Sequence, residues 1–261
     1  MRRPLHPAWL VLILMSLLAI MAEQLLPQAA TARLLAPFSP PSWQAGWVGW
    51  LGSDDLGRSI SGLLLIGLRE SLLVAVGSLL LALPLGCVLG LLSAFQGTLA
   101  QAAERLTMTC QVLPRFFLAI LVAAFYGATR EGLILVLGLS SWPLVARLVR
   151  AETLSLLQRP WLIASRLDGV SPWRLAWRHL LPHALQPLRA AASTVFGAAV
   201  MAEAAIGFIG LGDPRYQSLG ALLAQAFGLG PLLPWLACSA GGLLLGLILL
   251  VQWGLPPTDE T

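Results

Sequence analysis

The sequence predicts an all-α, polytopic membrane protein with six transmembrane helices and one long charged loop. Hydrophobic residues make up 57% of the 261 residues and charged residues only 11%, a composition that does not suit the surface of a soluble domain. Apolar stretches recur along the chain at about the 20-residue length that an α-helix needs to cross a membrane. Between two of these stretches lies an arginine-rich segment, residues 159–182, which requires water or a soluble partner.

The first predicted span, Ala8–Leu26, follows the basic residues Arg2 and Arg3. Its apolar run is longer than that of a typical signal peptide, and Glu23–Pro27 is a poor small-residue cleavage site. We therefore expect a true membrane anchor. The five later spans are predicted at Ser71–Phe95, Leu106–Tyr126, Gly132–Val149, His183–Ala205 and Leu232–Gly254.

The segment Pro27–Arg69 contains prolines, glycines and three tryptophans, Trp43, Trp47 and Trp50, and is not expected to span the membrane. Tryptophan suits the membrane interface, because its ring is apolar while its N–H seeks a hydrogen-bond partner. A simple connecting loop and a partner-docking surface are equally open interpretations of this segment.

Small residues in the second span indicate how it packs. Gly86 and Gly90 have the small-xxx-small spacing that lets helices approach closely, and packing within the chain is favoured over a dimer contact. Pro84 lies in the same span and should kink it.

The arginine-rich segment predicts two short helices. Pro160 suits the first position of a helix that ends at Gly169, where a left-handed residue is expected. Ser171 suits the N-cap of a second helix that extends to His179, and Pro182 opens the next span. Two short helices joined by a glycine form a rigid protrusion, which suits mechanical coupling better than catalysis. The first of them should present four apolar side chains to water: Trp161, Leu162, Ile163 and Leu167.

Composition excludes several kinds of chemistry. All sixteen basic residues are arginine, so the chain has no lysine for a standard P-loop or for Schiff-base chemistry. If ATP drives this protein, another polypeptide must bind the nucleotide and its Mg²⁺, and no cofactor is expected in this chain. The net charge of +4 comes largely from inner loops and does not require nucleic acid as a partner.

No catalytic or metal site is predicted. The three cysteines, Cys87, Cys110 and Cys238, are far apart in apolar runs and are interpreted as small buried residues. His179 and His183 form an i, i+4 pair without a carboxylate or thiol nearby, and we interpret them as polar residues near the membrane surface. The chain is therefore not expected to be an enzyme.

The arginines predict the orientation in the membrane. With the N-terminus inside, nine arginines fall on inner segments and five on outer ones, as the positive-inside rule requires. Both termini and residues 159–182 are then cytoplasmic. The inner set is Arg2, Arg3, Arg105, Arg147, Arg150, Arg159, Arg166, Arg174 and Arg178, and the outer set is Arg33, Arg58, Arg69, Arg130 and Arg215.

Glu203 is the carboxylate that most needs an explanation, since it lies at the end of an apolar stretch. A charged side chain in a span should face protein or water. It is interpreted either as part of a translocation path or outer gate, together with Phe208, or as a cap of the following segment. That segment is Ile206–Gly212, and its glycine-rich part, residues 207–212, is predicted to be a break before a re-entrant or outer segment.

Three motifs resemble those of the permeases of ABC importers, in the branch that includes peptide and nickel systems. Residues 159–182 resemble the family's cytoplasmic coupling loop, with Gly169 at the glycine position and Leu180-Leu181-Pro182 at its close. The family's Glu-Ala-Ala falls on Ile163-Ala164-Ser165, followed by a basic residue at Arg166, and only Ala164 matches outright. The other two motifs are Leu51–Ser59 with Arg69–Val74, and Ala202–Gly212.

The resemblance implies the C-type permease subunit of a dipeptide, oligopeptide or nickel importer in the bacterial inner membrane. It implies a homologous permease, two cytoplasmic ATPase subunits, an extracytoplasmic solute-binding protein and lipid as partners. It also implies that residues 161–166, Gly169 and Pro182 couple to the ATPase. The expected organisation is an N-terminal anchor and outer loop (1–70), a permease domain (71–254) and a cytoplasmic tail (255–261). Peptide, nickel and metal-chelate substrates all stay open.

Two other classes of membrane protein are weighed against this one. A secondary transporter or channel would carry its own ion-coupling site at mid-membrane, for which only Glu203 is a candidate. A membrane-embedded enzyme would need clustered His, Asp or Glu near one face, which the sequence does not offer.

Overall fold

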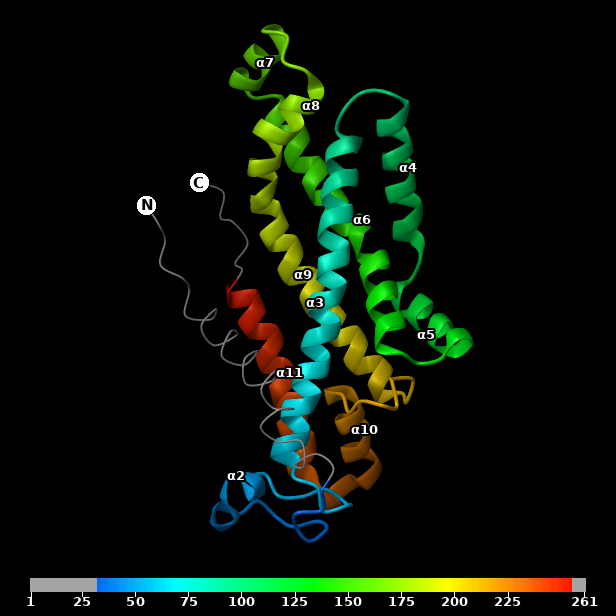
Figure 1. Cartoon of the computed structure of the whole chain (residues 1–261), viewed down its shortest axis with the longest axis vertical. Helices are drawn as coiled ribbons and strands as arrows, with labels where there is room; N and C mark the ends of the chain where they lie inside the picture. The colour runs from blue at the N-terminus through cyan, green and yellow to red at the C-terminus, as the bar shows by residue number, and fades with distance from the viewer. Residues whose placement is uncertain (1–31, 255–261) are drawn as a thin grey trace. The chain divides into compact units, whose positions relative to one another are not determined.

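The computed structural model describes residues 32–254, and every regular element of this part is helical (Figure 1). The predicted all-α class is therefore confirmed. The longer helices are α3 (Ile60–Ser93), α4 (Thr98–Val112), α5 (Arg115–Tyr126), α6 (Arg130–Leu157), α9 (Leu181–Phe208), α10 (Leu219–Leu229) and α11 (Pro234–Gly254). The short ones are α2 (Gly46–Gly49), α7 (Pro160–Leu167), α8 (Pro172–Leu175), the 3₁₀ turns Trp43–Ala45 and Gly230–Leu232, and the π-helical turn Ala176–Leu180.

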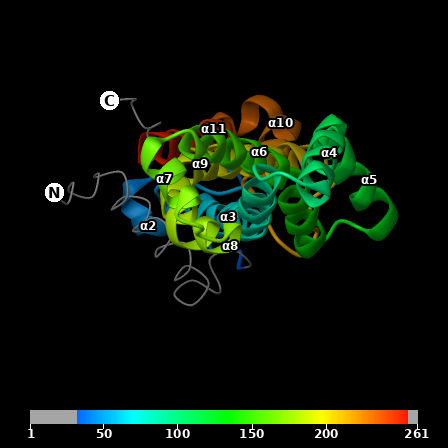
Figure 2. The same ribbon diagram turned by 90° about the horizontal axis from the view of Figure 1, so that it is seen from above.

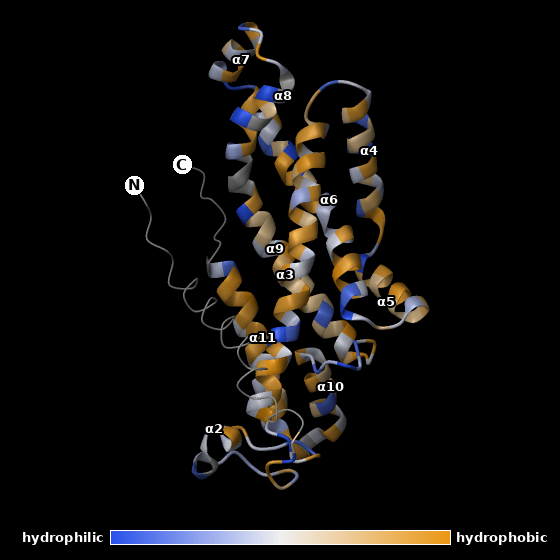
Figure 3. Cartoon of the chain, in the orientation of Figure 1, coloured by the Kyte–Doolittle hydropathy of each residue, from blue (hydrophilic) through white to orange (hydrophobic). Residues whose placement is uncertain are grey.

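Four helices of the described part are long and apolar enough to cross a membrane: α3, α6, residues 188–208 of α9, and α11. The pair α4 and α5 passes the same test together, which raises the number to five. Figure 3 shows the hydrophobic colour along most of α11, while hydrophilic colour gathers around α7 and α8. The sixth predicted span, Ala8–Leu26, lies outside the described residues. The structure thus supports a multi-pass membrane protein with four or five spans in residues 32–254.

The span predicted at Leu106–Tyr126 is wrong as a single straight helix. α4 ends at Val112, α5 begins at Arg115, and the two helices are bent by 75°. The cause is Pro114, which has no N–H to donate and restricts the residue before it. Leu113 accordingly has an extended backbone, with φ of −73° and ψ of 124°. The apolar pattern continues through this break, so hydropathy alone did not reveal it.

The chain divides into two compact units, and several long helices contribute residues to both. The described part of the first unit consists of residues 32–76, 119–133 and 197–254. The second consists of residues 77–118 and 134–196.

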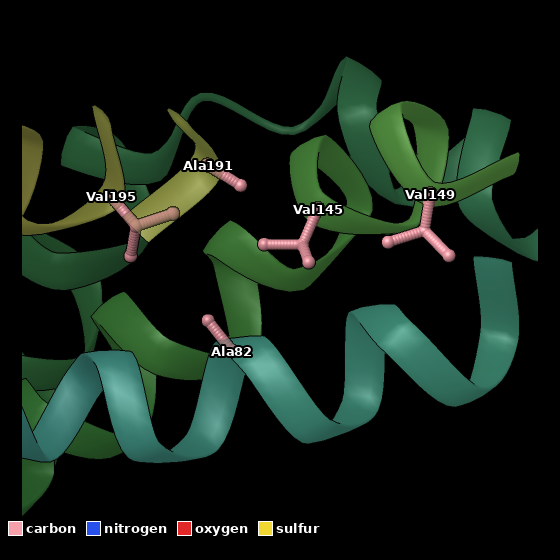
Figure 4. Close-up of a cluster of buried hydrophobic side chains, with 5 residues drawn as sticks. All are labelled: Ala82, Val145, Val149, Ala191 and Val195. Atoms are coloured by element: carbon pink, nitrogen blue, oxygen red, sulfur yellow. The ribbon is translucent and has the colours of Figure 1, made fainter. Parts of the chain in front are cut away.

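The second unit has a core where α3, α6 and α9 meet. Small and β-branched side chains from the three helices converge there: Ala82, Val145, Val149, Ala191 and Val195 (Figure 4). Gly86 and Gly90 lie against α6 in the same unit. A Cβ at Gly90 would come within 2.9 Å of the Val149 Cβ, and one at Gly86 would meet Val145. Packing within the chain, as predicted for these glycines, is confirmed.

In the first unit α10 and α11 lie side by side (Figures 1 and 2). α10 also packs closely on α9, because a Cβ added at Gly220 would overlap the backbone of Ala204. Only glycine permits this approach of the two backbones.

The loop that precedes α3 is organised by two neighbouring carboxylates. Asp54 is buried and accepts hydrogen bonds from the Arg58 N–H at 2.8 Å and from the Arg58 Nε at 2.7 Å. Asp55 accepts a bond from Gln225 of α10 at 2.6 Å, which joins the loop to that helix. These contacts leave Trp43 and Trp50 exposed as a tilted ring pair with centroids 5.5 Å apart.

Candidate functional site

Two features of the described chain stand out, and each lies within one unit. The first is the two-helix protrusion of residues 159–182, in the second unit. The starts of its helices agree with the predicted ones, since α7 begins at Pro160 and α8 at Pro172. The Ser171 Oγ accepts a hydrogen bond from the Arg174 N–H at 3.4 Å, as expected of an N-cap.

Gly169 joins the two short helices in a left-handed conformation, with φ of +76°. The Val170 N–H donates to the carbonyl oxygen of Ser165 at 3.2 Å, which closes the end of α7. Within the described chain, no atom lies within 4 Å of a Cβ added at Gly169, so backbone conformation and not crowding disfavours a larger residue. The predicted left-handed glycine is confirmed, while its role in coupling stays a prediction.

The apolar side chains of α7 do not share one face. Leu162 is fully buried against Leu175 and Leu180, so its predicted exposure to water is wrong. The reason is helical geometry: successive side chains point about 100° apart, and the three positions 161–163 cannot all face outward. Trp161 and Ile163 are roughly half exposed, and Leu167 is 84% exposed.

Trp161 packs against the π-helical turn and the start of α9. Its ring centroid lies 5.6 Å from that of His183 and 6.1 Å from that of His179. His183 is itself placed by its Nδ1, which lies 2.7 Å from the carbonyl oxygen of His179. The histidine pair therefore supports the tryptophan. Within residues 32–254, no three His, Cys, Asp or Glu side chains gather so that they could hold a metal ion.

The other predicted coupling residues lie on the same protrusion. Ala164 is exposed, and the Ser165 Oγ donates to the carbonyl oxygen of Trp161 at 2.9 Å. Arg166 occupies the last turn of α7, and Pro182 is exposed in the first turn of α9.

The second feature is a cavity of about 240 Å³ in the first unit. Its walls come from α3, α5, the start of α6, the end of α9, the loop 209–218 and α10. Glycine and alanine make up much of the lining, which leaves room for polar groups. The polar lining residues are Glu70, Thr129, Arg130, Glu203, Asp213, Tyr216, Gln217 and Ser218.

Arg130 contacts three of the other polar residues that line this cavity. Its Nε is 3.2 Å from a carboxylate oxygen of Glu70, and its guanidinium carbon is 3.7 Å from the centroid of the Tyr216 ring. Its backbone N–H donates to Asp213 at 3.1 Å. One residue at the start of α6 thereby connects α3 to the loop that follows α9.

Asp213 and Arg215 form a second charged pair in that loop. Arg215 donates from one guanidinium nitrogen to Asp213 Oδ2 at 2.6 Å and from its Nε to Oδ1 at 2.9 Å. The hydrogen bonds from the Arg215 side chain lower the pKa of Asp213 to about 2, from an ordinary value of 3.8. Arg215 also reaches Glu131 at 3.5 Å.

Glu203 lies on the cavity wall and is only 5% exposed. The Ser71 hydroxyl of α3 donates to its Oε2 at 2.7 Å, and the Ser218 hydroxyl is a second hydrogen-bonding neighbour. Its carboxylate therefore faces other elements and does not cap the segment that follows it in sequence. α9 ends at Phe208, inside the glycine-rich stretch 207–212 that was predicted to break the helix, and Gly210 follows with φ of +80°.

Phe208 is placed differently from Glu203. It contacts Phe227 edge to face, with centroids 5.5 Å apart, and is not part of the cavity lining. Glu70, Arg130, Asp213 and Tyr216 were not predicted from the sequence to form a group. A usable signal existed, because Arg69-Glu70 and Arg130-Glu131 each place a charged pair at the start of an apolar stretch.

Comparisons with known proteins agree with these features. Residues 82–253 match the profile of a family described as the inner membrane component of binding-protein-dependent transport systems. A Brucella ovis protein with a provisional peptide permease name is 34% identical over 224 residues, which are 84% of this chain and 73% of that protein.

Two further relatives carry more specific names. The di/tripeptide transport system permease DppC of Pseudomonas aeruginosa is 35% identical over 72% of this chain and 63% of its own length. The glutathione transport system permease GsiD of Pectobacterium atrosepticum is 35% identical over 68% of this chain and 60% of its own length.

A solved structure shares the fold. A chain of the MetNI methionine ABC transporter in an inward-facing conformation has a TM-score of 0.62 and 23% identity. The similarity covers 73% of this chain and 91% of that one, and at this identity it concerns the fold alone.

Proposed function

Because this chain belongs to the family of inner membrane components of binding-protein-dependent transport systems, we propose that it is a permease subunit of an ATP-driven importer of short peptides. The three relatives above are named for peptides, di/tripeptides and glutathione, which favours a peptide over a nickel ion or a metal chelate. Family membership also argues against a secondary transporter or channel that works without an ATPase.

The observation that carries the proposal is the family match over residues 82–253, which includes the protrusion of α7 and α8. We assign this protrusion the role of coupling element. An ATPase subunit that closes on ATP would push on the exposed side chains of α7, and the push would pass through Leu162 and its buried neighbours into the long helices. Trp161, Ile163, Ala164, Ser165, Arg166, Gly169 and Pro182 are the residues proposed to take part.

The partners follow from this role. A homologous permease would complete the membrane path, two cytoplasmic ATPase subunits would bind ATP and Mg²⁺, and an extracytoplasmic binding protein would deliver the peptide. No covalent chemistry is assigned to this chain. The cavity that contains Glu203 is proposed to be part of the path, with Phe208 beside it.

Orientation is testable by reporter fusions. With both termini and the α7–α8 protrusion cytoplasmic, fusions after Arg178 and at Thr261 should report the cytoplasm. A fusion near Trp43 should report the outer side. An outer signal from the Arg178 fusion would remove the basis for the coupling role.

The substrate class is testable by uptake. The chain, co-expressed with an ATPase and permease partner and reconstituted in proteoliposomes with the binding protein, should accumulate labelled tri-alanine when ATP is inside. Nickel and a nickel chelate serve as comparison substrates. ATP-dependent nickel uptake without peptide uptake would refute the proposed substrate class, and failure to co-purify with any ATPase would refute the importer.

A further inference from the structure

The lining of the cavity in the first unit contains more acidic than basic side chains. Its lining contains three carboxylates and one guanidinium. Two of the carboxylates are compensated: Glu70 pairs with Arg130, and Asp213 pairs with Arg215 from outside the lining. The third, Glu203, forms no ion pair with any residue of the described chain.

Glu203 is an unusual carboxylate in this position. It lies in the membrane-spanning part of α9, is buried, and is stabilised by hydroxyl groups. A carboxylate in a membrane span is costly unless it faces water, pairs with a cation or is protonated. Its place on the wall of a cavity means that a ligand can supply the missing cation.

The size of the cavity limits what that cation can be. A volume of about 240 Å³ far exceeds the roughly 10–15 Å³ that a single water needs on the same measure. It is smaller than the pockets of roughly 300–1,000 Å³ that enclose drug-sized ligands. It therefore suits one end of a small molecule. The lining also contains the small apolar side chains of Ala119, Ala123 and Ala221, which suit an aliphatic group.

We propose that this cavity binds the protonated amino terminus of a short peptide, with the Glu203 carboxylate as its ion-pair partner. An ammonium group donates three hydrogen bonds, and the wall offers acceptors in Glu203, Ser218 and Gln217. A bare metal ion is a poorer occupant, since no metal-binding group of three side chains exists in residues 32–254. This inference rests on the proposed peptide transport and adds which end of the peptide the permease recognises.

The test is peptide binding to the full chain, purified with its permease and ATPase partners and without the solute-binding protein. Tri-alanine and N-acetyl-tri-alanine differ only at the amino terminus, so calorimetric titration with each isolates the ammonium group. We expect wild type to bind tri-alanine at least tenfold more tightly than the acetylated peptide. Glu203→Gln should abolish this difference, and Glu203→Asp should restore part of it.

Two controls separate charge from folding. The glutamine side chain of the first variant keeps an oxygen that can accept from Ser71, so the helix packing should survive, as gel filtration and thermal melting will report. Glu131→Gln removes a carboxylate of the same unit that is 68% exposed and outside the cavity, and it should bind tri-alanine within twofold of wild type.

The outcomes distinguish this inference from the function it rests on. Equal binding of the two peptides by wild type, unchanged binding by Glu203→Gln, or no binding of either peptide overturns the inference. Peptide uptake by the complete transporter decides the proposed function separately. Uptake that persists in Glu203→Gln with no preference for a free amino terminus would leave the importer standing without this site.

Discussion

The guanidinium of Arg130 lies over the ring of Tyr216, with 3.7 Å from its central carbon to the ring centroid. Its Nε faces Glu70 at 3.2 Å, so the cation has a carboxylate on one side and an aromatic face on another. This arrangement connects α3, the start of α6 and the loop after α9 around one cavity. The guanidinium in the cavity lining is thus paired with Glu70, while within the described residues Glu203 is hydrogen-bonded by the Ser71 hydroxyl and has no cation as partner.

The ring of Tyr216, and not its hydroxyl, should stabilise this arrangement. A cation–π contact of a partly buried arginine contributes about 1–2 kcal/mol. Tyr216→Ala should therefore lower the free energy of unfolding in detergent by about that amount, while Tyr216→Phe, which keeps the ring, should change it little. Chemical denaturation of both variants is the measurement. Equal losses in the two would show that the hydroxyl matters and the ring does not.

Asp213 should make stability depend on pH in the acid range. Its pKa is about 2 when folded and 3.8 ordinarily, so the folded state holds the proton less tightly than the unfolded one. The stabilisation is complete above the ordinary pKa of 3.8 and is lost as the pH falls toward 2.

The midpoint of thermal unfolding, measured at a series of pH values from neutral down to the lowest pH at which the detergent stays soluble, should fall in wild type as the stabilisation from Asp213 is lost. Asp213→Asn should remove the part of the decline that Asp213 causes. Glu131→Gln is the matched control. It removes an exposed carboxylate that lies 3.5 Å from the same arginine but leaves the Asp213–Arg215 pair in place, so the acid decline should remain. An identical acid decline in Asp213→Asn and wild type would contradict the assignment.

Gly169 should be required for coupling and not for insertion. Valine is penalised at φ of +76°, whereas asparagine adopts this conformation more readily. We expect Gly169→Val to retain ATPase activity but lose peptide uptake, and Gly169→Asn to keep most of both. Uptake per ATP hydrolysed, measured in proteoliposomes, is the readout. Peptide uptake at the wild-type level by Gly169→Val would contradict the proposed role of Gly169 in coupling.

Trp161 should hold the ATPase through apolar contact. Its ring is half exposed and positioned by His183, and the family's acidic residue at this site is replaced by Ile163. Trp161→Ala should weaken ATPase association by about 2 kcal/mol, as expected of an aromatic anchor. Moderate salt should have little effect, because apolar contacts are not screened. Strong salt sensitivity with a silent Trp161→Ala would instead favour Arg159 and Arg166.

Leu162 should support the protrusion from inside. Its side chain is buried with Leu175 and Leu180, and removing a buried leucine side chain costs about 2–5 kcal/mol. Leu162→Ala should therefore open residues 159–182 to trypsin, which has only arginine to cleave in this chain. The side chain of Ile163, the next residue, is half exposed, so Ile163→Ala should be cleaved at close to the wild-type rate. Equal protection of both variants would argue against a packed protrusion.

Some features could be predicted because they depend on local chemistry. The left-handed Gly169 follows from an Asp-Gly sequence at a helix end, and the N-cap at Ser171 follows from the serine before a proline. Helix type and the approximate places of α3, α6, α9 and α11 follow from apolar stretches long enough to span a membrane.

The break at Pro114 shows the limit of hydropathy. A hydropathy average adds up side chains and does not register a missing backbone N–H, so one predicted span is in fact two helices bent by 75°. The apolar character of Leu162 was likewise evident from the sequence. Whether its side chain faces water or the interior depends on the rotation of α7 about its axis and on its contacts with Leu175 and Leu180.

The all-helical class, the membrane-spanning character and the membership in a transport family could all be predicted from the sequence, because they depend on composition, on the length of apolar stretches and on the order of motifs. That Glu70, Arg130, Glu203 and Asp213 line one cavity became evident from the folded chain. They are separated along the chain by up to 143 positions, from Glu70 to Asp213, and no local pattern relates them. Which carboxylates of this lining pair with a cation of the described chain depends on how helices distant in sequence pack against one another.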